Sequence, residues 1–118
     1  MNRNIHLPPG VSEFDLGAGG SLPGSWVPHW QADPARIALS TLDNDAITGG
    51  EILDRTSDRA ARFAGAGLGA GDRVLLCGPT SLDYVLTYVA ALRAGLAVVP
   101  ANPGLSGAEL VALARAAT

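Results

Sequence analysis

Residues 71–100, GDRVLLCGPTSLDYVLTYVAALRAGLAVVP, decide the fold class of this 118-residue chain. Two short apolar runs, at 74–77 and 96–99, have the unbroken hydrophobicity of strands that are buried on both faces, which is typical of parallel sheets. Between them, apolar residues recur at helical spacing and end at Gly95. A strand, a helix and a second strand in this order predict a right-handed parallel crossover of the α/β class.

Two further helices and a hairpin are predicted on either side of this unit. Thr48 with Glu51, and Ser106 with Glu109, have the spacing of capping boxes, in which each side chain accepts a backbone N–H of the other residue. Each box begins a segment with helical periodicity. Residues 37–47 contain an alternating run, a polar turn and a short return, which predict a hairpin.

The chain divides into two parts that differ in composition and in hydrophobic periodicity. Residues 34–118 are predicted to form a layered, parallel-sheet (Rossmann-like) α/β subdomain. We expect this subdomain to be partial, because the order of elements stops where another strand is expected. Residues 1–33 are rich in proline and glycine and predict an irregular N-terminal arm. Trp26 and Trp30 are interpreted as anchors that attach the end of this arm to the domain on a short helical turn.

Composition excludes several classes of function. A single cysteine rules out an intramolecular disulfide framework and a cysteine-rich zinc module. The net charge of −3 argues against a nucleic-acid-binding surface. The sequence shows neither a secretory signal nor a transmembrane segment, so we expect a cytoplasmic protein. All eight basic residues are arginine, and a Walker-type phosphate loop requires a lysine.

No catalytic residue and no metal site are predicted from spacing. The glycine cluster at 65–71 follows a helix and precedes a strand, whereas a phosphate-binding loop follows a strand and opens a helix. We therefore interpret it as a helix stop. The turn at 77–82 places two hydroxyls before a helix and is interpreted as a cap rather than an anion site. Cys77 is predicted to be a small buried hydrophobic residue.

Six short blocks carry a resemblance to a known family. In chain order they are DPARIAL (33–39), ITGGEI (47–52), GLGAGDRV (67–74), GPTSLDY (78–84), RAGLAVVPANP (93–103) and SGAEL (106–110). Together they resemble the N-terminal region of AMP-forming acyl-CoA synthetases, in the superfamily of adenylate-forming acid–thiol ligases. Gly49 and Gly50 depart from the Tyr-Ala usual in that family.

The resemblance implies a two-step reaction for the whole enzyme. ATP and a fatty or aromatic carboxylic acid would give an acyl-adenylate and pyrophosphate, and the acyl group would then pass to CoA. The family's phosphate loop and both catalytic lysines lie downstream of the matched region. ATP, Mg²⁺ and CoA are thus implied for the parent enzyme, and we expect this chain alone to be inactive and to bind none of them tightly.

One turn is implied to approach a cofactor. Asn102, Pro103 and Gly104 match a family loop near the tunnel for the pantetheine arm of CoA, and they are the only candidate cofactor-binding residues. Ligands of open α/β sheets do bind at the carboxyl ends of strands. A plain strand-to-helix turn, set by proline and glycine, is the alternative interpretation.

Two other functions remain open at this point. The first is an acyl-adenylating enzyme that uses a carrier protein, as a peptide-synthetase adenylation domain does, in place of CoA. The second is a non-catalytic α/β module that binds a partner, or a second copy of itself as a dimer, through an unfinished sheet edge.

Overall fold

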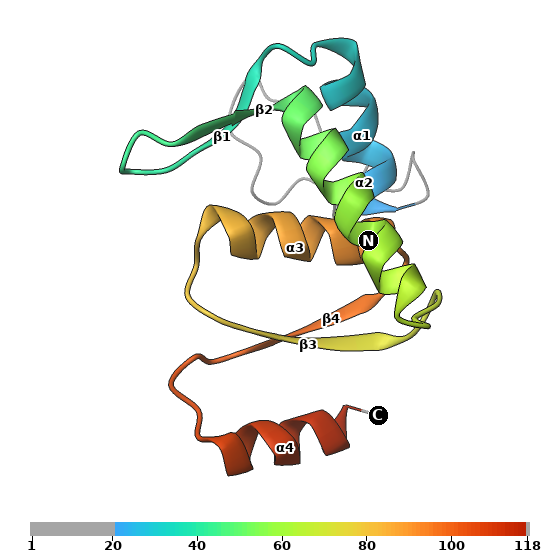
Figure 1. Cartoon of the computed structure of the whole chain (residues 1–118), viewed down its shortest axis with the longest axis vertical. Helices are drawn as coiled ribbons and strands as arrows, with labels where there is room; N and C mark the ends of the chain where they lie inside the picture. The colour runs from blue at the N-terminus through green and yellow to red at the C-terminus, as the bar shows by residue number, and fades with distance from the viewer. Residues whose placement is uncertain (1–20, 118) are drawn as a thin grey trace, which may run out of the picture.

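The computed structural model describes residues 21–117. The elements follow one another as α1 (Leu22–Ala32), β1 (Ile37–Ser40), β2 (Ala46–Thr48), α2 (Gly49–Gly65), β3 (Arg73–Cys77), α3 (Leu82–Arg93), β4 (Ala97–Ala101) and α4 (Gly107–Ala116). Figure 1 shows α3 on one side of the β3–β4 pair and α4 on the other, with α2, α1 and the hairpin beyond α3. The predicted layered α/β class is confirmed.

The two central strands are parallel, as predicted. Their register runs from Arg73 opposite Ala97 to Cys77 opposite Ala101. The hairpin strands β1 and β2 pair antiparallel in a sheet of their own. Each sheet in the described part of the chain thus has two strands.

Burial of the central strands is lower than the sequence predicted. Residues 74–76 and 98–99 are only half-buried, and Cys77 is exposed. The prediction that Cys77 is a buried hydrophobic residue is therefore wrong. The physical reason is that, among the described residues, each strand of this pair has one hydrogen-bonded neighbour instead of two, so the strand ends lack the cover that a wider sheet provides.

The core lies between the hairpin, α2 and α3. Ile47, Ile52 and Leu86 are almost fully buried and pack together. Ile47 precedes the N-cap of α2 and Ile52 lies in its first turns, so the two side chains form a hydrophobic staple beside the Thr48–Glu51 capping box. The half-buried side chains that pack against this core are Trp30, Leu39 and Leu82.

Both capping boxes are confirmed. Thr48 Oγ1 accepts the backbone N–H of Glu51 at 3.2 Å, and Glu51 Oε1 accepts that of Thr48 at 3.2 Å. In α4, Ser106 Oγ accepts the N–H of Glu109 at 3.2 Å, and Glu109 Oε1 accepts that of Ser106 at 3.3 Å. Local sequence thus fixes where α2 and α4 begin.

Residues 22–32 of the predicted irregular arm form a helix. Helix α1 spans eleven residues, so the expectation of irregular structure is wrong from Leu22 to Ala32. Ser21 caps it by accepting the N–H of Gly24 at 3.1 Å, and Pro23 occupies an early position where no N–H is required. Trp26 and Trp30 stand 6.2 Å apart between ring centroids on this helix. The part of the arm at residues 1–20 lies outside the described residues.

Among the described residues, no helix combines the length and the apolar character needed to cross a membrane.

Candidate functional site

The carboxyl ends of β3 and β4 meet at one edge of the sheet and bring the predicted turn residues close to Cys77. Cys77 Sγ lies 3.6 Å from the backbone oxygen of Asn102. Parallel strands in register place their carboxyl ends side by side, so two residues 25 positions apart in sequence become neighbours. This edge is the topological position at which open α/β sheets bind ligands.

The side chain of Asn102 stabilises the turn from β4 to α4. Asn102 Oδ1 accepts the backbone N–H of Gly104 at 2.8 Å, and the Asn102 carbonyl accepts the N–H of Leu105 at 3.1 Å. A Cβ added to Gly104 would lie 3.3 Å from Asn102 Oδ1, a tight approach. Asn102, Pro103 and Gly104 are all exposed. The turn therefore presents an ordered backbone to solvent.

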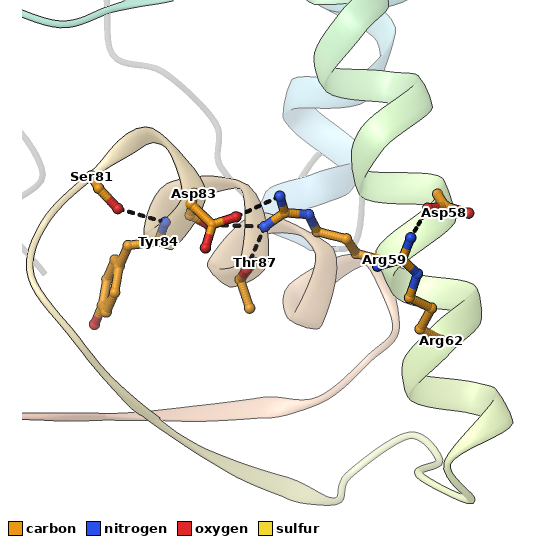
Figure 2. Close-up of polar contacts among 7 residues, drawn as sticks. All are labelled: Asp58, Arg59, Arg62, Ser81, Asp83, Tyr84 and Thr87. Carbon is orange, nitrogen blue, oxygen red and sulfur yellow. Dashed lines mark hydrogen bonds and ion pairs between the residues drawn. The ribbon is translucent and has the colours of Figure 1, made fainter.

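The turn from β3 to α3 acts as a helix cap, as the sequence predicted. Ser81 Oγ accepts the backbone N–H of Tyr84 at 3.1 Å, a bond drawn in Figure 2. This bond uses the hydroxyl to satisfy one of the free N–H groups at the start of α3.

An arginine on α2 holds the start of α3. Arg59 donates to Asp83 Oδ1 at 2.6 Å, to the Asp83 carbonyl at 3.0 Å and to Thr87 Oγ1 at 2.6 Å. Figure 2 shows its guanidinium reaching from α2 across to the first turns of α3. Three hydrogen bonds from one planar group fix the two helices in both distance and rotation.

A second arginine, at the C-terminal end of α3, donates hydrogen bonds back to α2. Arg93 donates to the Leu53 carbonyl at 3.0 Å and to Thr56 Oγ1 at 2.7 Å, and Thr56 is fully buried. Sequence analysis missed both inter-helix arginines, because the partners lie 24 to 40 positions apart and no local spacing reveals such contacts. The indirect signal was the lack of an acidic partner four positions before Arg59 or Arg93.

The strand-end edge carries polar groups at the starts of α3 and α4. The two turns, at 77–82 and 101–106, contain no basic residue. They offer backbone groups, hydroxyls and an amide as hydrogen-bond donors and acceptors. Within residues 21–117 there is also no group of three or more His, Cys, Asp or Glu side chains that would hold a metal ion.

An α/β unit with ordered turns at the carboxyl edge of its parallel strands is typical of nucleotide- and coenzyme-using enzymes. The sequence pattern of the family described as AMP-binding enzyme matches residues 28–118. The chain therefore belongs to this family of adenylate-forming enzymes, and the predicted resemblance is confirmed.

Two curated relatives are named as ligases that join a carboxylic acid to CoA or to AMP. The chain is 33% identical over 97 residues to a putative fatty-acid–CoA ligase, FadD25, of Mycobacterium tuberculosis, a match that covers 75% of this chain and 16% of the relative. It is 40% identical over 76 residues to the p-hydroxybenzoic acid–AMP ligase FadD22 of Mycobacterium marinum, covering 64% of this chain and 10% of the relative.

Solved structures agree with the sequence comparisons. Klebsiella oxytoca NpsA in complex with 3-hydroxyanthranilyl-AMSN superposes with a TM-score of 0.73 at 26% identity, over 81% of this chain and 20% of that one. The chain thus spans between a tenth and a fifth of the length of these three proteins.

Proposed function

We propose that the described residues are the N-terminal scaffold of an AMP-forming acyl-CoA synthetase. The observation that carries this proposal is the family match over residues 28–118, joined to relatives whose names describe activation of fatty and aromatic acids. In the complete enzyme a carboxylate oxygen attacks the α-phosphorus of ATP and pyrophosphate leaves. The CoA sulfur then attacks the acyl carbon and AMP leaves.

The chain's own part in this reaction is to position the thiol-bearing arm. Asn102, Pro103 and Gly104 would line its path, where the exposed backbone of an ordered turn can exchange hydrogen bonds with neutral amides. CoA, when bound, supplies the nucleophilic thiol. Arg59 and Arg93 keep α3 fixed on α2, so that the strand-end edge has one geometry.

A second candidate keeps the adenylation step and changes the acceptor. The relative at 40% identity is named a p-hydroxybenzoic acid–AMP ligase, a name that leaves the acceptor of the acyl group open, so a carrier protein is the second candidate acceptor. Both acceptors bear a thiol on a neutral arm, so the same turn would serve either.

The test measures the two half-reactions separately in the complete polypeptide that contains these residues. Fatty and aromatic acids are screened by ATP–pyrophosphate exchange, and thioester formation is followed with CoA and with a phosphopantetheinyl carrier protein. The 118-residue chain alone should catalyse no exchange, because it holds no lysine. Measurable exchange by the short chain would contradict the scaffold role.

The turn is tested with a matched pair of glycine variants. Gly104→Ala places a Cβ 3.3 Å from Asn102 Oδ1, whereas Gly107→Ala meets nothing within 4 Å. Gly104→Ala should raise the KM for the thiol acceptor roughly three- to tenfold and leave pyrophosphate exchange unchanged, because misplacing a positioning group by a fraction of an ångström affects only its own step. Equal behaviour of the two variants would remove this turn from the thiol path.

A further inference from the structure

The backbone carbonyl of Asn102 accepts hydrogen bonds from two different parts of the chain. The thiol of Cys77, at the end of β3, donates to this oxygen with an S···O distance of 3.6 Å, and the N–H of Leu105 donates to it at 3.1 Å. Leu105 directly precedes the residue that caps α4. This one oxygen therefore connects the end of β3 with the segment that leads into α4.

The side chain of Asn102 is bonded within the same turn. Its Oδ1 accepts the N–H of Gly104 at 2.8 Å, the local bond by which asparagine side chains imitate a backbone turn. A Cβ at Gly104 would lie 3.3 Å from this oxygen, so the side chain and the turn fit closely. Asn102 thus uses a side-chain oxygen and a backbone oxygen to hold two successive N–H groups of its own turn.

Hydrogen bonds are the main support of this turn. None of the residues 102–106 is buried, so core packing does not hold them in place. An exposed turn keeps one conformation when its own polar groups hold it, and it opens when they do not. The bonds made by Asn102 therefore decide whether the backbone groups of Pro103 and Gly104 have a fixed position.

We propose that Asn102 is a positioning residue for transfer of the acyl group to the thiol acceptor, and that Cys77 holds it against the end of β3. This inference rests on the proposed function, which places the turn on the path of the thiol-bearing arm. Asn102 acts through Gly104 and Leu105, whose backbone it orders, and Cys77 acts through the Asn102 carbonyl. The thiol arm takes part only in the second half-reaction, so loss of these contacts should leave adenylation unchanged.

The first test compares two substitutions of Asn102 in the complete polypeptide. Asn102→Ala removes the side-chain oxygen that holds Gly104, whereas Asn102→Asp keeps one. Pantetheine serves as the acceptor in every assay, because it lacks the phosphates of CoA that an added carboxylate would repel. Asn102→Ala should raise the KM for pantetheine roughly three- to tenfold, as loss of one hydrogen bond predicts, and leave kcat and pyrophosphate exchange within about twofold. Asn102→Asp should stay within about twofold in all three. Equal KM values for the two variants would overturn the positioning role.

The second test needs no catalytic activity. Hydrogen–deuterium exchange at the amides of Gly104 and Leu105 reports how often the turn opens. Asn102→Ala and Cys77→Ala should speed this exchange at least about threefold, whereas Cys77→Ser, which keeps a donor, should change it less than about twofold. Gly107→Ala is the matched control at the start of α4, because its new Cβ meets nothing within 4 Å.

The outcomes separate this inference from the proposed function. Unchanged amide exchange in Asn102→Ala and Cys77→Ala would overturn the inference whatever the acceptor assays give. A complete polypeptide that forms thioesters, but in which Asn102→Ala keeps its KM for pantetheine, would overturn the positioning role and leave the proposed function intact. A complete polypeptide that forms no thioester with any acceptor would overturn the proposed function itself, and the positioning role with it.

Discussion

Close packing at the start of α2 leaves little room for a Cβ at Gly49 and Gly50. A Cβ on Gly49 would lie 3.1 Å from both Cα and Cβ of Trp30, and one on Gly50 would lie 3.2 Å from the Pro34 carbonyl oxygen. Backbone bonds tighten the approach, since Gly49 N–H donates to Arg36 O and Gly50 N–H to Pro34 O, each at 3.0 Å. Glycine therefore replaces the usual tyrosine of the family pattern where α1 packs closely against the start of α2.

The residue-scale prediction concerns this close approach. Gly49→Ala should lower the free energy of unfolding by about 1–3 kcal/mol, because the new methyl group meets backbone atoms that cannot rotate away. Gly65→Ala, on the same helix with nothing within 4 Å, should leave stability unchanged or raise it by up to about 1 kcal/mol. Urea denaturation followed by tryptophan fluorescence measures both. An equal loss of stability in both variants would show that the contact with Trp30 does not decide the result.

Single residues also show where sequence reasoning stops. The capping residues Thr48, Ser81 and Ser106 were predicted correctly because each cap depends only on groups two or three positions away. Cys77 was predicted wrongly because burial depends on how many strands flank β3, which its own apolar run does not state. The contact of Cys77 with the Asn102 carbonyl follows from strand register, which appears only when the sheet is assembled.

At the scale of elements, the pairing of α2 with α3 depends on polar contacts as well as on the core. Arg59 is 25% exposed at its side chain and makes three hydrogen bonds to α3, whereas Arg55 makes a 3.6 Å contact to Glu51 on its own helix and is 53% exposed. The two residues lie one turn apart on the same helix. A comparison of the two residues therefore distinguishes the stability contributed by inter-helix hydrogen bonds from that contributed by a solvent-exposed ion pair.

The element-scale prediction compares these two arginines. Arg59→Ala should reduce the free energy of unfolding by about 1–2 kcal/mol, a value already lowered because Asp83 is largely exposed. Arg55→Ala should change it by less than about 0.5 kcal/mol. Thermal and urea unfolding give both values. If Arg59→Ala matches Arg55→Ala, the hydrogen bonds to Asp83 and Thr87 add nothing to the packing of α2 on α3.

Helix α1 shows how an element can be missed although its signals are present. Ser21 followed by Pro23 is a start signal for a helix, yet Pro28 and the surrounding glycines favoured an irregular interpretation. Tertiary contact resolves the conflict, since Trp30 packs against the core beneath α2. The other helices were predicted because their apolar faces, caps and stops agree with one another.

At the scale of the whole molecule, the β3–β4 sheet has two edges that no other described strand covers. Strands β3 and β4 pair only with each other among the described residues, so each has one edge of backbone donors and acceptors open to pairing. Pro100 in β4 removes one donor and weakens, without abolishing, that edge. The parallel pairing of β3 with β4 could be predicted from sequence, and the role of the turn after β4 stays a prediction. The identity of what pairs with these edges could not, because strand pairing is a property of the assembled sheet.

We expect the isolated chain to form a dimer through an edge of the β3–β4 sheet, with a sedimentation coefficient that rises with concentration. Ala97→Lys adds a charge at an exposed position of β4 and should weaken self-association about tenfold, equivalent to 1.4 kcal/mol, because the charge must be desolvated when strands pair. Ala61→Lys adds the same charge at an exposed position of α2 and should leave the association unchanged. A monomer at every concentration, or equal effects of the two lysines, would rule out pairing at this edge.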